Sequence, residues 1–198
     1  NVPPRDPFPV VYTSGSNLPD RNCVQMVDAL PLILEQVPAA VLRFAGTYAP
    51  GLENELRARA RQAGVEASLE LLGPLPYLEH FARSFRAHVG CVFLADTPKN
   101  HFANSNRLFE YMYCALPVLA EDLPGPRAVV EAARCGLIVD SRDPRAIAES
   151  AAYLLTHPEE AAEMGRRGRE AVLAEHNFAV DYARLDGLYG RITRGIVP

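Results

Sequence analysis

Short apolar runs alternate with amphipathic segments along almost the whole chain, and this alternation constrains the fold most strongly. Runs rich in β-branched and apolar residues that end at Gly, Pro or Ser predict strands. Apolar residues that recur every three or four positions predict helices. The predicted strands are 10–13, 41–45, 69–72, 89–94, 117–120 and 136–139. The predicted helices are 20–36, with Asp20 as its N-cap, 51–63, 77–87, 105–114, 127–134, 144–156, 158–175 and 178–194.

Six apolar strands separated by helices predict an α/β fold, namely a Rossmann-like doubly wound parallel sheet of about six strands with helices on both faces. Right-handed crossovers would bring the carboxyl ends of the strands to one edge, where ligands bind near the switch in strand order. Ser14-Gly15-Ser16-Asn17 is interpreted as the turn that ends the first strand.

The ends of the chain differ from its middle. Residues 1–8 are Pro-rich and lack an initiator Met, so we interpret them as the remnant of a linker and the chain as a fragment of a longer protein. Residues 9–175 form the predicted domain. Residues 176–198 form a C-terminal helix that we expect to pack toward a missing N-terminal domain.

Composition excludes several classes of function. A net charge of -4 argues against a nucleic-acid-binding surface, which is usually basic. No apolar run approaches the roughly 20 residues that cross a bilayer. The four cysteines contain no C-x-x-C pair, and we interpret them as buried reduced thiols rather than metal ligands or disulfides. They are Cys23, Cys91, Cys114 and Cys135.

The segment from Ala95 to Met112 carries the most chemical information. A loop leaves an apolar strand and enters the predicted helix near Ser105. The amino end of such a helix offers unpaired N–H groups and a positive dipole, which suit a phosphate, and Arg107 adds a charged donor. Glu110, one turn later, is suited to accept hydrogen bonds from sugar hydroxyls. The alternative is a solvated ion pair between Arg107 and Glu110, three residues apart.

A resemblance bears on these alternatives. The stretch 104–112 (N-S-N-R-L-F-E-Y-M), followed by 115–120 (A-L-P-V-L-A), resembles the donor-site block of family 4 glycosyltransferases, which have the GT-B fold. The resemblance runs from Val10 onward and is most specific in the middle. It implies the C-terminal, nucleotide-sugar-binding domain of such an enzyme.

The resemblance implies roles for individual residues. Glu110 matches the second glutamate of a paired-glutamate motif and would bind the ribose hydroxyls. Arg107 matches a basic residue beside the donor diphosphate, and Arg21 matches a second one. Glu110 and Arg107 are therefore the predicted catalytic residues. The predicted donor-binding residues are Gly15, Ser16, Arg21, Gly73, Asn104, Ser105, Asn106, Arg107, Leu108 and Glu110.

Three positions depart from the family pattern. Phe102 stands where the first glutamate is expected, beside the transferred sugar. We therefore expect sugar recognition to be altered or supplied by neighbours, namely Asn100, His101 or Asn104. Ser16 replaces a basic residue and Ala115 replaces a glycine. Related enzymes with an N-S-N-[KR]-L-F-E-Y-M stretch also lack the first glutamate, which favours subfamily variation over a dead site.

Other candidate residues are weaker. The histidines show no spacing typical of metal ligands, and among them His101, in the loop that precedes Ser105, is the functional candidate. No Asp-x-Asp or H-E-x-x-H pattern indicates a metal, and the single glycine of the first turn excludes a dinucleotide fingerprint. Tyr111 and Met112 are expected in the core. Arg166, Arg167 and Arg169 are interpreted as a solvated helix face rather than a lipid contact.

These observations predict the donor-binding part of a retaining, metal-independent glycosyltransferase that needs no cofactor and is inactive without its acceptor domain. A non-catalytic GT-B-like scaffold and a nucleotide-sugar epimerase are the alternatives. The predicted partners are a nucleotide-sugar donor and the missing N-terminal acceptor domain of the same chain, with no nucleic acid. We expect a cytoplasmic location. Peripheral association of the full-length protein with the inner face of the membrane is left open.

Overall fold

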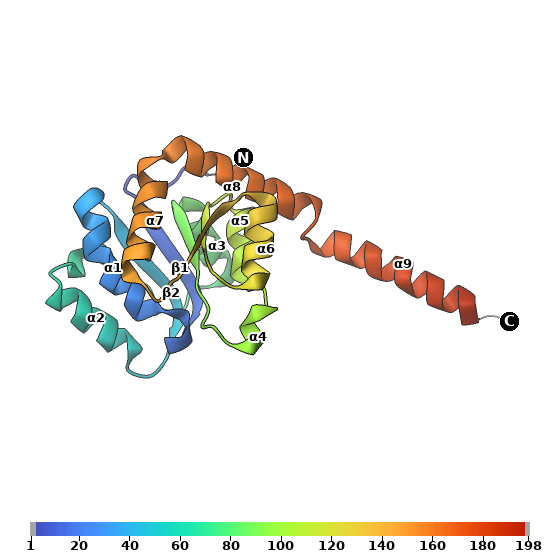
Figure 1. The fold of residues 1–198 in the computed structure, drawn as a ribbon, viewed down its shortest axis with the longest axis horizontal. Helices are drawn as coiled ribbons and strands as arrows, with labels where there is room; N and C mark the ends of the chain where they lie inside the picture. The colour runs from blue at the N-terminus through green and yellow to red at the C-terminus, as the bar shows by residue number, and fades with distance from the viewer. Residues whose placement is uncertain (1–2, 197–198) are drawn as a thin grey trace.

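The computed structural model describes residues 3–196, including the side chains of residues 3–193, and contains one six-stranded parallel sheet. The strands lie in the order β3-β2-β1-β4-β5-β6, so the strand order reverses between β1 and β4. Helices cover both faces (Figure 1), and the predicted doubly wound fold is confirmed. The strands are β1 (Val10–Asn17), β2 (Val41–Tyr48), β3 (Leu69–Leu71), β4 (Val89–Val92), β5 (Val118–Glu121) and β6 (Gly136–Val139).

The helices begin and end close to the predicted positions, with two exceptions. They are α1 (Cys23–Gln36), α2 (Leu52–Gln62), α3 (Tyr77–Arg86), α4 (Pro98–His101), α5 (Asn106–Tyr113), α6 (Pro124–Ala133), α7 (Pro144–Thr156), α8 (Pro158–Ala174) and α9 (Phe178–Ile196). The prediction that Asp20 caps the first helix is wrong, because Pro19–Arg21 forms a separate 3-10 turn and Asn22 precedes α1 in the left-handed conformation. The short α4 lies in a segment predicted as a loop.

The first two strands are longer than predicted. β1 continues through Ser14-Gly15-Ser16-Asn17, which the sequence indicated as a turn, and pairs with β2 along eight positions. Gly15 lies opposite Gly46, and a Cβ on Gly46 would stand 1.8 Å from the carbonyl oxygen of Gly15. Without a side chain at Gly46, the backbones of β1 and β2 can approach closely here, and both strands continue past their predicted ends.

Two apolar layers sandwich the sheet. Alternate residues of β1 enter opposite layers: Val11 packs in the layer with α1, α2 and α7, whereas Val10 and Tyr12 pack in the layer with α5. Tyr111 and Met112 are fully buried in the second layer, as predicted. All four cysteines are buried, as predicted, and none is in a disulfide; that they are reduced thiols without a metal stays a prediction.

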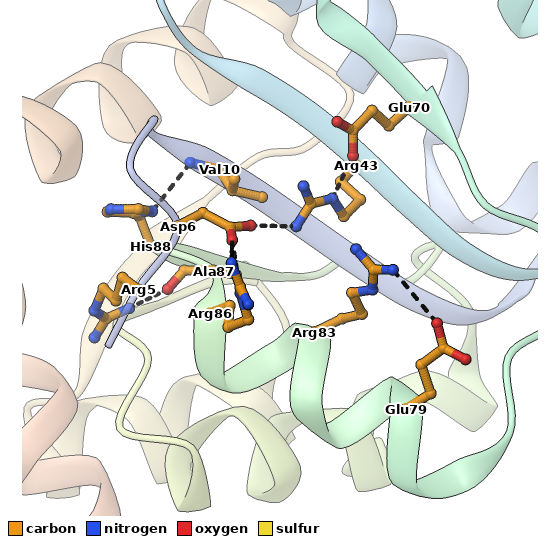
Figure 2. Close-up of polar contacts among 10 residues, drawn as sticks. All are labelled: Arg5, Asp6, Val10, Arg43, Glu70, Glu79, Arg83, Arg86, Ala87 and His88. Atoms are coloured by element: carbon orange, nitrogen blue, oxygen red, sulfur yellow. Dashed lines mark hydrogen bonds and ion pairs between the residues drawn. The ribbon is translucent and has the colours of Figure 1, made fainter. Parts of the chain in front are cut away.

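An ion-pair network anchors the amino-terminal segment (Figure 2). The Asp6 carboxylate accepts from Arg43 on β2 and from Arg86 at the end of α3, each at 2.7 Å. Arg43 also pairs with Glu70 on β3. Arg5 donates to the carbonyl oxygens of residues 87 and 115. Residues 5 and 6 are therefore fixed to the domain although they lie within the predicted linker.

The last helix, α9, projects away from the rest of the molecule (Figure 1). Large apolar side chains along it are exposed, namely Phe178, Tyr182, Leu185, Leu188, Tyr189 and Ile192. Within residues 3–196 we find no helix with the length and apolarity to cross a membrane. Packing of α9 against another domain stays a prediction.

Candidate functional site

A cavity of about 420 Å³ opens at the carboxyl edge of the sheet, near the reversal in strand order. Its walls come from the ends of β1 and β2, from the loop after β3, and from α3 and α5. The lining residues are Ser14, Gly15, Ser16, Ala45, Gly46, Thr47, Pro74, Leu75, Tyr77, His80, Asn106, Arg107 and Glu110. This is the edge where the sequence predicted a ligand to bind.

Arg107 lies in the first turn of α5 and is 8% exposed. Its Nη1 donates to the Ser14 carbonyl oxygen at 2.8 Å and to Thr13 Oγ1 at 3.1 Å, and its Nε donates to Ser105 Oγ at 3.4 Å. These acceptors are neutral, so they orient the guanidinium without cancelling its charge. The alternative of an Arg107–Glu110 ion pair is wrong: Glu110 pairs with His80, and the Arg107 guanidinium donates to these three oxygens.

A second guanidinium lies close to the first. Burial lowers the pKa of Arg21, and the nearby charge of Arg107 lowers it further. Asp20 gives Arg21 a loose ion pair at 3.7 Å, but Arg21 Nε is buried without a hydrogen-bond partner among the described residues. Bringing two like charges together and leaving a donor unpaired is costly unless an anion lies between them.

Glu110 lies one helical turn after Arg107 and also lines the cavity. Its side chain is 24% exposed, and its Oε2 lies 3.3 Å from His80 Nε2 on α3. The carboxylate is therefore partly desolvated and faces a hollow that already contains a positive group. Such a carboxylate can accept hydrogen bonds from hydroxyl groups of a ligand.

His80 is a site residue that the sequence analysis missed. Its Nδ1 lies 3.1 Å from the Tyr12 hydroxyl, and its ring stacks on that of Tyr12. The sequence gives it no neighbour at metal-ligand spacing. The usable signal was its position in the first turns of a helix that follows a strand, which places it at the same edge of the sheet as Glu110.

The remaining predicted binding residues lie in different places relative to the cavity. Gly15, Ser16 and Asn106 line the cavity, and Ser105 precedes α5 as its N-cap without a side-chain capping bond. Gly73 lies in an adjoining hollow that shares Thr47 and Pro74 with the cavity, and Asn104 is exposed outside it.

Leu108 was wrongly predicted as a binding residue. Its side chain is fully buried beneath α5, and its N–H donates to the Ser105 carbonyl oxygen. Neither group is available to a ligand. The helical spacing that places Arg107 and Glu110 at the cavity turns Leu108 to the opposite, apolar side.

The loop before α5 places Phe102 at 88% exposure. The neighbours predicted to replace the missing glutamate do not line the cavity: Asn100 donates to the Ala95 carbonyl oxygen, and His101 pairs with Asp96. A role for these residues in sugar recognition stays a prediction.

Comparisons of the sequence with a family model and with a curated protein point to the same family. The family model described as "Glycosyl transferases group 1" matches residues 2–171. The protein named "Putative glycosyltransferase EpsD" of Bacillus subtilis (strain 168) is 25% identical over 168 residues, which is 85% of this chain and 42% of that protein.

Solved structures share the fold. Sucrose-phosphate synthase from Thermosynechococcus elongatus aligns with a TM-score of 0.80 at 22% identity, over 96% of this chain and 46% of its own. Anabaena Alr3699/HepE, solved in complex with UDP and glucose, aligns with a TM-score of 0.74 at 17% identity, over 92% of this chain and 49% of its own. The chain spans less than half the length of each of these relatives.

Proposed function

The chain belongs to the glycosyl transferases group 1 family and forms one half of a GT-B fold, and we propose that its cavity binds the nucleoside diphosphate of a sugar donor. One observation carries this proposal: the guanidinium of Arg107 is buried at the cavity with neutral acceptors only. Its charge acts on Arg21, whose Nε has no hydrogen-bond partner among the described residues, although Arg21 does not line the cavity. A buried positive charge without a counterion favours an anionic ligand.

The shape of the site supports a nucleotide rather than a simple anion. Glu110 would be repelled by a phosphate, but it is suited to ribose hydroxyls one helical turn from the diphosphate. Beyond it, Pro74, Leu75 and Tyr77 give an apolar wall for a base. HepE was solved with UDP, which makes UDP the first nucleotide to test.

In the full-length enzyme, Arg107 and Arg21 would stabilise the negative charge that develops on the leaving diphosphate as the bond to the sugar breaks. We propose that this occurs with retention at the anomeric carbon and without a metal, with the acceptor held by an N-terminal domain. Transfer by the full-length protein, followed by NMR of the first product formed, tests retention. Loss of transfer on adding EDTA would refute metal independence.

The test of nucleotide binding is calorimetric titration of this chain with UDP, GDP and ADP. We expect Arg107→Ala to weaken binding of the preferred diphosphate by about 1.5 to 3 kcal/mol, the range for a hydrogen bond to a charged group. The matched control is Arg127→Ala, which removes an exposed arginine of α6 that pairs with Asp122 and Glu131 outside the cavity. Equal affinities for the two variants would refute the phosphate assignment.

A non-catalytic scaffold is the second candidate, favoured by the exposed Phe102 in place of a glutamate. The same titration separates the two functions, because a scaffold would bind none of the three nucleotides.

A further inference from the structure

We propose that His80 is a positioning residue that holds the Glu110 carboxylate for the ribose, with Tyr12 holding His80 in turn. The inference rests on the proposed nucleotide binding and adds residues on two other elements of the fold, which hold the carboxylate in place. Glu110 belongs to α5, His80 to α3 and Tyr12 to β1. Their side chains form one continuous chain of hydrogen bonds that ends at the cavity.

With Glu110 ionised and His80 neutral, these hydrogen bonds have one direction. An ionised carboxylate only accepts, so Nε2 of His80 donates to Glu110 Oε2. In a neutral imidazole the other nitrogen then accepts, so the Tyr12 hydroxyl donates to Nδ1. Burial raises the pKa of Tyr12 well above its ordinary value, which keeps this hydroxyl protonated as a donor.

The environment of His80 limits its movement. Its side chain is 15% exposed, and its ring stacks on Tyr12 with the ring planes 25° apart. Phe81 contacts the ring edge-on from the same helix. A ring packed against two aromatic neighbours has little freedom to turn, so Nε2 keeps its direction toward Glu110.

The consequence concerns the carboxylate. With Oε2 of Glu110 held by His80, the carboxylate loses its rotational freedom before a ligand arrives, so binding costs less side-chain entropy. The carboxylate then faces the cavity in one orientation, ready to accept from the neighbouring 2′ and 3′ hydroxyls of a ribose. A deoxygenated sugar would gain nothing from this arrangement, so the site would select ribonucleotides.

The test compares two ligands, UDP and 2′,3′-dideoxy-UDP, by calorimetric titration of the chain. We expect His80→Ala to weaken UDP binding about five- to tenfold, the net effect of losing one intramolecular hydrogen bond. We expect no change for the dideoxy ligand. His80→Gln, whose amide nitrogen can replace Nε2, should restore most of the UDP affinity. In a background of Glu110→Gln, adding His80→Ala should cause little further loss.

A purely structural role for His80 predicts a different result. His80→Ala would then weaken UDP and dideoxy-UDP equally, and His80→Gln would give no rescue; either result overturns the proposal. Thermal melting of each variant identifies loss of the fold, and His80→Gln keeps the test decisive if the alanine variant unfolds. If the unmodified chain binds neither ligand, the proposed nucleotide site itself is refuted. If the unmodified chain binds UDP and His80→Ala binds it equally well, only the role of His80 is refuted.

Discussion

Replacing Asp6 by Asn should destabilise the domain more than any comparable surface substitution. The Asp6 carboxylate is 6% exposed and lies 2.7 Å from both Arg43 and Arg86. Arg43 is itself buried, on a strand inside the sheet, with its side chain 3% exposed. Asn keeps the shape of Asp but removes the negative charge, so Arg43 would retain only Glu70 as a counterion.

The magnitude follows from this burial. Removing one partner of a buried ion pair costs about 3 to 5 kcal/mol where the remaining charge is left uncompensated, and here Glu70 still compensates Arg43 in part. Asn can still accept one hydrogen bond, so we expect the free energy of unfolding to fall by about 3 kcal/mol. The matched control is Asp28→Asn, which breaks the exposed pair with Arg59 and should cost about 0 to 1 kcal/mol.

Urea denaturation followed by circular dichroism measures both variants under the same conditions. A further variant, Asp6→Asn with Arg43→Met, should recover part of the loss because it removes the buried charge that has lost Asp6 as a counterion. If Asp6→Asn costs no more than Asp28→Asn, the ion-pair network does not stabilise the fold and the interpretation is wrong.

The same network predicts a dependence on pH. Burial by itself raises the pKa of Asp6, but the hydrogen bonds and charges of Arg43 and Arg86 outweigh it and hold the pKa below the ordinary value of 3.8. A lowered pKa stabilises the folded state above the unfolded pKa, and this stabilisation is lost as the pH falls through the folded pKa. The unmodified chain should therefore lose more stability below about pH 4 than Asp6→Asn does.

Two further predictions concern the core and the last helix. Burial raises the pKa of Cys23 and Cys135 to about 11 and that of Cys91 and Cys114 to about 12. A thiol reagent at neutral pH should therefore label none of the four before urea is added. Rapid labelling of the native chain, counted by mass spectrometry, would contradict this. Deleting residues 178–198 should change the free energy of unfolding by less than about 1 kcal/mol, because the large side chains of α9 are exposed; a larger loss in urea denaturation would show that α9 stabilises this domain.

The fold could be predicted because its determinants are local in sequence. Each strand is a short apolar run and each helix has its own apolar face, so their alternation predicts a parallel sheet before any contact is known. The ends of β1 and β2 could not be predicted in this way. Gly15 resembles a turn signal, and its place within a strand depends on Gly46, which lies opposite it in the neighbouring strand.

The site, like the fold, could be predicted only where its residues lie close together in the sequence. Helical spacing placed Arg107 and Glu110 at one edge, and both line the cavity. Their partners lie far away in the sequence: Arg107 is held by Thr13 and Ser14 on β1, and Glu110 by His80 on α3. A single sequence can indicate that such residues lie at the same edge of the sheet, as for His80, but it does not show which of them form hydrogen bonds with each other.

These distant partners explain how opposite charges three residues apart on one helix can serve the same cavity. Side chains at this spacing ordinarily attract each other, and a direct pair would neutralise both. Here neutral oxygens at the end of β1 hold the guanidinium of Arg107, while an imidazole holds the carboxylate of Glu110. Each group keeps its charge and faces a different part of the cavity. The extension of β1 past its expected end is what makes this possible, because the Ser14 carbonyl oxygen that accepts from Arg107 belongs to that extension.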